Sequence, residues 1–420
     1  MNKVELLAPA GNFEKLKVAF HYGADAVYAG LDKLSLRANA DNFTREELMQ
    51  AIEYTHSIGK KIYIALNIYF MPEHEERIID ALNFLAKIKP DGMIISDMGI
   101  LYLAKEYAPN IPIHISTQAN CTNQYAAKMY STLGVSRVVL ARELGLNAIK
   151  EIRKTLPNLE LEAFIHGAMC IAYSGRCLLS SYMTTQGLGT QKDDGTRSAN
   201  QGDCAHSCRW EFFLKEKTRE NDTFDISSDE NGTYILSSKD ICMIEHVKDL
   251  IDAGVSSFKI EGRMKSILYI SSIVRAYRYV IDCIQSGKTL DKMEQVYQEL
   301  DVVSHREFST GFFYKKPWND ANIASSAEYK RNTRLAAMVL SSEQKANLKI
   351  YNKITQNDKL VLIGKNMKTI EIGKVQFFDK NGNPALEAKH TEPFSAILYD
   401  TDGNIVIPEE MDILRMESNF

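Results

Sequence analysis

The sequence contains no long apolar run. None of its segments approaches the roughly 20 consecutive apolar residues that a membrane-spanning helix requires. Residues 1–16, MNKVELLAPAGNFEKL, lack the apolar stretch of a signal peptide. We therefore expect a protein that does not contact membranes and that resides in the cytoplasm. Cysteines are mostly reduced there, so a cluster among the seven present would indicate metal or redox chemistry rather than a disulfide framework.

A large excess of charge of either sign is also absent. The 50 Lys and Arg residues and the 54 Asp and Glu residues leave a net charge of -4. Without a global basic field, an RNA partner would have to be held by a local patch. The 45% apolar and 25% charged residues are typical of a globular protein with a sizeable core, and a length of 420 residues predicts two domains.

Several catalytic signatures are missing. The sequence has no HExxH zinc-protease helix, no GxSxG nucleophile elbow and no GxxxxGK[ST] phosphate loop. Hydrolysis therefore has no evident motif, although a nucleophilic pair of Cys170 and His166 is an alternative. The first strand-to-helix turn, APAGNF, lacks the GxGxxG dinucleotide fingerprint, and this disfavours a doubly wound open sheet.

The pattern of apolar runs predicts a (β/α)8 TIM-like barrel over residues 1–330. Eight short apolar runs alternate with amphipathic stretches, at residues 4–10, 25–30, 61–68, 92–98, 111–117, 136–142, 159–167 and 256–262. The alternation is interrupted by a long insertion at about 168–250, and such long loops are usually functional or disordered. After about residue 330, short strand-like runs separated by turn signals predict a small β-barrel domain over 331–420, with a sandwich as the alternative.

Polar side chains follow the predicted strands at their C-terminal ends, where barrels of this type carry their active sites. These residues are Arg37, Asn39, Asn67, Asp97, Gln118, Asn120, Arg142, Glu143, His166, Glu261 and Arg263. We assign substrate binding to Arg37, Asn67, Gln118 and Arg142, and catalysis to His166, Glu261 and Arg263. Arginines on one rim favour a carboxylate or phosphate ligand because the guanidinium binds such groups bidentately. The alternative is a set of rim ion pairs, such as Arg142 with Glu143 or Glu261 with Arg263.

Five cysteines fall inside or at the edge of the insertion: Cys170, Cys177, Cys204, Cys208 and Cys242. Soft sulfur ligands suit zinc or an iron–sulfur cluster, which both take four of them. The spacings are not diagnostic of either centre, so unligated thiols stay an alternative. His166 is a further candidate ligand, a general acid or base, or a hydrogen-bonded rim residue. Cys121 and Cys283 stand apart from this group.

The stretch EAFIHGAMCIAYSGRCLLS at 162–180 resembles the signature of the collagenase-like peptidases of unknown catalytic type, peptidase family U32. Further matching stretches cover nearly the whole chain: LLAPAGNFEKLKVAFHYGADAVYAG, NQGDCAHSCRW, LSSKDICMIEHV and FKIEGRMKS. The family is named for proteolysis. The resemblance nevertheless implies oxygen-adding roles, above all prephenate-dependent hydroxylation of the tRNA wobble uridine to 5-hydroxyuridine.

The same resemblance implies further properties. One branch of the family hydroxylates a cytidine of ribosomal RNA, and ubiquinone-pathway relatives hold a [4Fe–4S] cluster with four cysteines. By motif those ligands correspond to Cys170, Cys177, Cys204 and Cys242, with Cys208 a bystander or a replacement. The implied partners are a tRNA, prephenate as a small carboxylate co-substrate, and iron–sulfur delivery proteins. Zinc, a collagenase-like peptidase and a non-catalytic partner protein are the competing hypotheses.

Overall fold

The protein is described in a computed structural model, which covers residues 3–31, 34–35, 42–170, 172–184, 197–210, 227–229, 232–234, 238–314, 333–343, 345–390 and 394–417. The chain divides into two compact units. The first comprises residues 1–16, 25–264 and 306–328, and the second comprises residues 17–24, 265–305 and 329–420. No helix in the described ranges is both long and apolar enough to cross a membrane.

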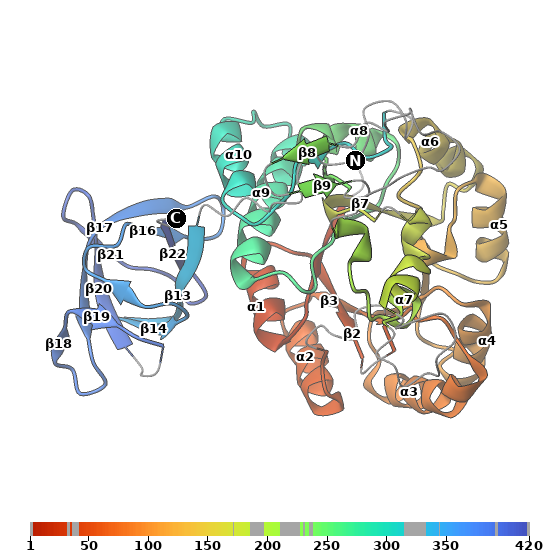
Figure 1. Ribbon diagram of the computed structural model, residues 1–420, viewed down its shortest axis with the longest axis horizontal. Helices are drawn as coiled ribbons and strands as arrows, with labels where there is room; N and C mark the ends of the chain where they lie inside the picture. The colour runs from red at the N-terminus through yellow and green to blue at the C-terminus, as the bar shows by residue number, and fades with distance from the viewer. Residues whose placement is uncertain are drawn as a thin grey trace. The chain divides into compact units, whose positions relative to one another are not determined.

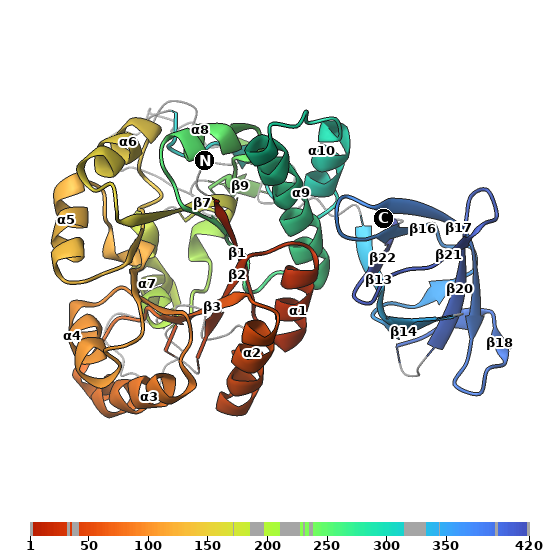
Figure 2. The same ribbon diagram turned by 180° about the vertical axis from the view of Figure 1, so that it is seen from behind.

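A closed barrel of eight parallel strands forms the first unit (Figures 1 and 2). The strands are β1 (Glu5–Pro9), β2 (Ala26–Gly30), β3 (Lys61–Leu66), β4 (Gly92–Ile95), β5 (Ile113–Ile115), β6 (Arg137–Val139), β7 (Glu160–Ala168) and β11 (Ser257–Ile260). Each strand pairs in parallel with the next, β11 pairs with both β1 and β7, and these last pairings close the ring. All eight predicted strands are therefore confirmed, and so is the TIM-like barrel.

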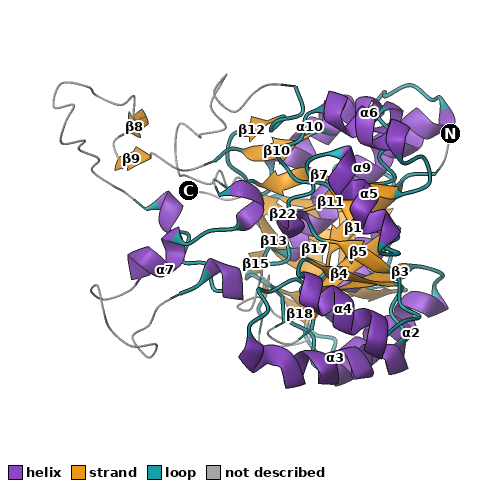
Figure 3. Ribbon diagram, turned by 90° about the vertical axis from the view of Figure 1, so that its right-hand side faces the viewer, coloured by secondary structure: helices purple, strands orange, loops and turns teal. Residues whose placement is uncertain are grey.

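Helices surround these strands (Figure 3). They are α2 (Arg45–Ser57), α3 (Glu75–Ile88), α4 (Met98–Tyr107), α5 (Gln124–Thr132), α6 (Leu146–Thr155) and α8 (Val247–Asp252), and α1 (Phe13–His21) follows β1 along the chain. The spacing of apolar residues explains their packing. In α3, for example, the buried residues are Ile78, Ala81, Leu82 and Leu85, which form one stripe along the helix.

The insertion adds short elements between β7 and β11. They are η3 (Tyr173–Gly175), α7 (Leu179–Thr184), η4 (Ala199–Gln201), η5 (Ser207–Arg209), β8 (Ser227–Asp229), β9 (Gly232–Tyr234), β10 (Asp240–Cys242) and η6 (Ile244–His246). β10 pairs antiparallel with β7, and β12 (Phe308–Ser309) pairs in parallel with β10. The sheet therefore carries two additional strands beside β7, which the pattern of apolar runs did not predict.

The second unit contains α9 (Ile267–Ser286), α10 (Met293–Asp301) and an antiparallel barrel. Its strands are β13 (Thr333–Ser342), β14 (Ala346–Ile350), β15 (Ile354–Thr355), β16 (Leu360–Ile363), β17 (Thr369–Phe378), β18 (Pro384–Ala385), β19 (Glu387–Ala388), β20 (Phe394–Asp400), β21 (Ile405–Val406) and β22 (Ile413–Glu417). Pairing in the order β17, β16, β22, β13, β14, β20 and back to β17 closes the ring. The predicted β-barrel is thus confirmed, and the sandwich alternative is wrong.

A buried polar cluster ties the helices of the second unit to its barrel. Arg275 Nη1 donates to the carbonyl oxygens of Gly364 and Lys368 at 3.0 and 2.8 Å. Glu299 on α10 accepts from Arg275 at 2.8 Å and from Arg415 of β22 at 2.7 Å. Because these side chains are almost fully buried, the pairing satisfies charges that would otherwise be costly to remove from water.

Candidate functional site

The C-terminal ends of the barrel strands surround a small cavity of about 50 Å³. Its wall includes five residues that the sequence singled out, Asn67, Gln118, Arg142, Glu261 and Arg263. The fold explains why residues so far apart in the sequence meet here, since each follows a parallel strand or ends one. The cavity has room for about three or four water-sized groups, which matches the carboxylate end of a small molecule.

The amide side chains of the wall are oriented by one another. Asn67 Nδ2 donates to Gln118 Oε1 at 2.9 Å, and the Ser116 hydroxyl also donates to Gln118 Oε1. These bonds fix which face of each amide the cavity meets. A site with oriented hydrogen-bonding groups can distinguish ligands by the placement of their polar atoms.

Arg142 is held on three sides. Its Nη1 donates to the Ala168 carbonyl at 2.9 Å, and its Nη2 lies 3.3 Å from Glu261 Oε2. The guanidinium carbon lies 4.0 Å from the centre of the Phe164 ring. Its Nε is buried and has no hydrogen-bond partner among the described residues. Such a donor favours an added acceptor, because an unsatisfied buried N–H is costly. Arg142 thus pairs with Glu261 through Nη2, while its buried Nε is the donor that a ligand could satisfy.

Lys259 also lines the cavity, although it was not among the residues predicted from the sequence. Its Nζ lies 2.9 Å from Glu162 Oε1 and 4.4 Å from the centre of the Tyr28 ring. A lysine in the middle of the apolar strand SSFKIEG was the signal that could have revealed it. With Arg142 and Arg263 it gives the wall three cations against two carboxylates, Glu261 on the wall, which pairs with Arg142, and the buried Glu162, which pairs with Lys259. This excess of positive charge favours an anionic ligand.

A buried ion network lies beneath the cavity inside the barrel. Arg137 Nη1 lies 2.6 Å from Glu5 Oε1 and 3.0 Å from Glu162 Oε2. Burial acts to raise the pKa of Glu162, but Lys259 and Arg137 outweigh it and hold that pKa below its ordinary value. Glu162 is therefore an anion that fixes the position of Lys259 in the wall.

The other rim residues have different surroundings. Arg37 and Asn39 lie outside the described residues. Asp97 caps α4 by accepting from the backbone amides of Gly99 and Ile100. His166 is buried, and its ring centre lies 5.5 Å from that of Phe308 on β12. His166 is not among the described residues that line the cavity, and its assigned catalytic role stays a prediction.

Part of the insertion is fastened to the rim of the barrel. Glu143, which follows β6, accepts from the backbone amide of Ser174 at 2.6 Å and from its hydroxyl at 2.7 Å. Arg176 Nε donates to the Gln118 carbonyl at 3.0 Å, and the Tyr69 amide donates to the Asn200 carbonyl at 3.2 Å. Figure 3 shows α7 of this segment beyond one end of the barrel strands. The segments 172–184 and 197–210 therefore form a cap on the mouth.

Hydrogen bonds join these two segments and bring their cysteines into one region. The Cys177 amide donates to Asn200 Oδ1 at 3.1 Å. The Ser180 hydroxyl donates to the Arg197 carbonyl at 2.7 Å and accepts from the Ala205 amide at 2.9 Å. Cys204 precedes Ala205, so its position is fixed by the same contacts.

Neighbouring groups shift the pKa of Cys170. Burial raises the pKa of this thiol, the Ala172 amide and Arg142 oppose the rise, and the Cys177 and Cys204 thiols add to it. The Cys177 and Cys204 thiols and the Arg142 guanidinium are therefore all close enough to Cys170 to act on its charge. Arg142 thus belongs to both the cavity wall and the surroundings of the cysteines.

The donor set fits a metal centre in its chemistry. Cys170 and Cys204 each accept a hydrogen bond from the amide two residues later, and the distance from the His206 amide to Cys204 Sγ is 3.4 Å. Such bonds stabilise thiolates and tune clusters. Cys242 lies on β10 opposite His166, and Cys208 lies half-buried in η5. Within the described ranges, no three His, Cys, Asp or Glu side chains already stand in the geometry of a metal site.

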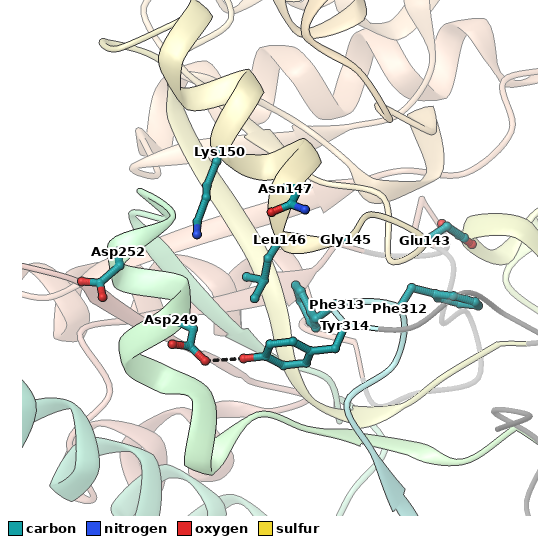
Figure 4. A pocket seen from close by; sticks show the side chains of 10 residues that line it. All are labelled: Glu143, Gly145, Leu146, Asn147, Lys150, Asp249, Asp252, Phe312, Phe313 and Tyr314. Atoms are coloured by element: carbon teal, nitrogen blue, oxygen red, sulfur yellow. Dashed lines mark hydrogen bonds between the residues drawn. The ribbon is translucent and has the colours of Figure 1, made fainter. Parts of the chain in front are cut away.

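A second, larger cavity of about 670 Å³ lies between α6, α8 and residues 312–314. Figure 4 shows Lys150 and Asp249 on its walls, with the Tyr314 hydroxyl bonded to Asp249. Its wall carries the carboxylates of Glu143, Asp249 and Asp252 against the one ammonium of Lys150. This charge disfavours a carboxylate or phosphate ligand, so the smaller cavity is the better candidate for the anion site.

The fold and the site define a class of TIM-like barrel proteins in which a cysteine-bearing segment caps a cationic mouth. The chain belongs to peptidase family U32, whose family model matches residues 11–322.

Three proteins similar to this chain carry different functional names. The chain is 36% identical over 408 residues to tRNA hydroxylation protein P1 of Bacillus subtilis (strain 168), covering 96% of this chain and 93% of that protein. It is 39% identical over 381 residues to an uncharacterized protease of Methanocaldococcus jannaschii, covering 88% and 89%. It is 37% identical over 283 residues to a 23S rRNA 5-hydroxycytidine synthase of Escherichia coli (strain K12), covering 67% of this chain and 40% of that protein.

Proposed function

We propose that this protein is an RNA-hydroxylating enzyme whose substrate is a tRNA and whose product carries 5-hydroxyuridine at the wobble position. The similarity to tRNA hydroxylation protein P1 over 96% of the chain supports this choice of substrate. The structural observation that carries the proposal is Arg142, which lines the anion cavity and also acts electrostatically on Cys170. A small-molecule site and a group of thiols therefore adjoin at the barrel mouth, where the active sites of such barrels lie.

The proposed cofactor is a [4Fe–4S] cluster, with zinc as the alternative. Cys170, Cys177 and Cys204 would hold it, with Cys242 as the fourth ligand. A bound cluster supplies one-electron redox chemistry. The chain's own contribution is to orient the sulfur atoms with backbone amides and to place the positive charge of Arg142 beside Cys170.

The proposed co-substrate is a small carboxylate such as prephenate. Arg142 can offer its buried Nε–H to a carboxylate, and the guanidinium of Arg263 and the ammonium of Lys259 add positive charge. Asn67 and Gln118 would orient the remaining polar groups. Arg37 stays a further substrate-binding prediction. For an intracellular tRNA enzyme we also propose a cytoplasmic location and iron–sulfur delivery proteins as partners.

Two other functions, hydroxylation of ribosomal RNA and proteolysis, are each suggested by the name of a relative. The E. coli relative that acts on 23S rRNA makes ribosomal RNA a second candidate substrate. Proteolysis has the name of the M. jannaschii relative in its favour. Burial raises the pKa of Cys170, however, so its thiol is protonated near neutral pH and is a poor nucleophile. His166 is packed against Phe308 rather than placed on the cavity wall.

The deciding experiment compares modified tRNA nucleosides by mass spectrometry in a deletion strain and in complemented strains. We expect 5-hydroxyuridine to disappear on deletion, to return with the wild-type gene and with Cys283→Ala, and to stay absent with Cys170→Ala. Restoration by Cys170→Ala would support a non-catalytic partner instead. If deletion leaves the tRNA nucleosides unchanged but alters the modification of a ribosomal cytidine, the substrate is ribosomal RNA instead of tRNA.

Iron and sulfide analysis after anaerobic purification tests the cofactor separately. A brown protein with about four iron atoms per chain is expected for the cluster. A colourless protein that contains zinc would favour zinc as the cofactor. The peptidase hypothesis is tested separately, by incubation of the protein with gelatin, with and without a thiol blocker.

A further inference from the structure

One outer face of the C-terminal barrel combines lysines with aromatic and aliphatic side chains. In β17 and β20 the inward side chains Val375, Phe377, Ala396 and Leu398 belong to the apolar core of the barrel. Because successive side chains in a strand point to opposite faces, their neighbours in the two strands point outward. We call the resulting surface the lysine–aromatic face; it comprises Lys345, Lys374, Phe378, Ile397, Tyr399 and Ile405.

Strand register places these residues beside one another. Lys374 of β17 lies opposite Tyr399 of β20, and Tyr399 lies opposite Ile405 of β21. Phe378 lies opposite Ser395 of β20, and Lys345 Nζ lies 3.4 Å from the centre of the Phe378 ring. Lys374 Nζ lies 5.6 Å from the centre of the Tyr399 ring. The lysine stems therefore run along aromatic surface.

The charges of this face differ from those of the rest of the barrel. Lys353 and Lys389 are both ion-paired with Glu387, and Lys359 is ion-paired with Glu417. Lys345 and Lys374 form no ion pair within the described part of the chain. The outward side chains between them on β17 and β20, Gln376, Ser395 and Ile397, are uncharged, and the next outward charged side chain of β17 is the exposed Glu371. The face is thus locally basic on a protein whose net charge is -4.

Partly exposed apolar surface at Ile397, Tyr399 and Ile405 fits an RNA strand where it adjoins lysines that form no ion pair among the described residues; Phe378 itself is buried under Lys345. Phosphates bind ammonium groups, and bases stack on tyrosine and on flat apolar surface with little dependence on sequence. The side chain of Ile405 is 61% exposed, an unusual position for isoleucine in a barrel that has its own complete core. A local patch of this kind is also what a chain with no global basic field needs to hold RNA.

We propose that the lysine–aromatic face binds the RNA substrate, with Lys345 and Lys374 contacting phosphates and Tyr399 with Ile405 supporting a base. This inference rests on the proposed function, because it assumes that the substrate is an RNA.

Fluorescence anisotropy with the full-length protein and an unmodified tRNA transcript that carries a wobble uridine tests the proposal. The double variant Lys345→Glu, Lys374→Glu should weaken binding at least tenfold at moderate salt. Loss of two phosphate contacts should also lower the slope of log affinity against log salt by about 2. Tyr399→Ala should weaken binding about tenfold with the salt slope unchanged, because stacking displaces no counterions.

The matched control is Lys353→Glu, Lys359→Glu, which makes the same change of charge elsewhere on the barrel. Thermal melts establish that all variants fold. If the double variant binds tRNA no more weakly than this control, the face does not bind RNA. If the variant instead changes the sedimentation of the protein while tRNA binding is unaffected, the face is a contact between copies of the chain and the proposal is wrong.

The assay separates this inference from the proposed function. A wild-type protein that binds and hydroxylates tRNA while the double variant matches the control contradicts only the assignment of the face. A wild-type protein that neither binds nor modifies tRNA contradicts both.

Discussion

The two barrels of this protein differ in whether charged side chains lie in their interior. In the parallel barrel, Arg137 of β6 reaches Glu5 of β1, a strand that it does not adjoin, so the ion network crosses the interior. In the antiparallel barrel the interior is a cluster of apolar side chains that includes Leu348, Leu362 and Phe377. Its buried Arg415 alternates with the core residues Leu414 and Met416 and pairs with Glu299 of α10 on the outside.

The difference shows that charged side chains are buried in the parallel barrel even though burying charge costs free energy. Burying an ion pair is often no more stabilising than burying apolar side chains of the same size. The apolar barrel shows that the chain can form a conventional core. Charges inside the other barrel are therefore best explained by the cavity above them, where Glu162 holds Lys259 in the wall.

The largest effect is expected from Glu162→Gln. The substitution leaves Lys259 buried without the carboxylate that it pairs with and leaves Arg137 with the partly exposed Glu5 and Glu160, and breaking a buried pair typically costs about 3–5 kcal/mol of unfolding free energy. Urea unfolding followed by circular dichroism measures this loss. The control is Glu160→Gln, since Glu160 also pairs with Arg137 but is half exposed, and it should cost no more than about 1 kcal/mol. Equal losses for the two variants would contradict the interior network.

The pH dependence of unfolding distinguishes the barrels further. The pKa of Glu162 is held below its ordinary value, so its contribution is present above pH of about 4.3 and is lost as the pH falls through the lower folded-state value. Leu362→Ala in the other barrel should cost about 2–5 kcal/mol through the cavity it leaves, with the same loss above and below a pH of about 4.3. A wild-type protein and a Glu162→Gln variant with identical acid profiles would argue against this assignment.

A smaller effect is expected from Arg142→Lys. A lysine keeps the charge but lacks the buried Nε–H donor, so the KM for the proposed carboxylate co-substrate should rise about 10- to 100-fold, the value of one strong charge-assisted interaction. Steady-state kinetics that separate KM from kcat test this. Lys150→Gln in the larger, acidic cavity should leave the KM unchanged. A rise in KM for Lys150→Gln alone would move the anion site to that cavity.

The smallest effect concerns iron uptake. Burial raises the pKa of Cys170, and the thiol must lose its proton before it binds a metal. Iron affinity should therefore increase as the pH rises, by at most about tenfold per pH unit for this one proton. Anaerobic titration between pH 7 and pH 9 measures the trend, and Cys121→Ala provides a control outside the cap. A Cys170→Ala variant whose profile is as steep as that of the wild type would show that Cys170 contributes no ligand proton.

The strand pattern was predictable because it depends on local properties. Parallel strands covered by helices are apolar on both faces, and runs such as KIYIALNI are therefore visible in the sequence. The five predicted rim residues that line the small cavity could be found for the same reason, since they follow strands that all end on one edge. The insertion was visible as an interruption of the alternation, and its cysteines as a local concentration of soft ligands.

The contacts across the barrel were not predictable in this way. Sequence proximity suggested the pair Arg142 with Glu143, whereas closure of the barrel pairs Arg142 with Glu261, and Glu143 binds Ser174 of the cap. The added strands β10 and β12 bring Phe308 against His166, which no period in the sequence indicated. Lys259 was missed because its partner Glu162 lies on another strand, 97 positions away in the chain.

The sequence by itself determined the eight-stranded barrel, the second barrel and the residues available at the mouth, because side-chain periodicity and strand ends are local features. The tertiary structure alone decided which charges neutralise one another, which cavity carries excess positive charge, and which cysteines share an environment with Arg142. Coulomb interactions and burial depend on distance in space, and ring closure sets those distances between residues remote in the chain.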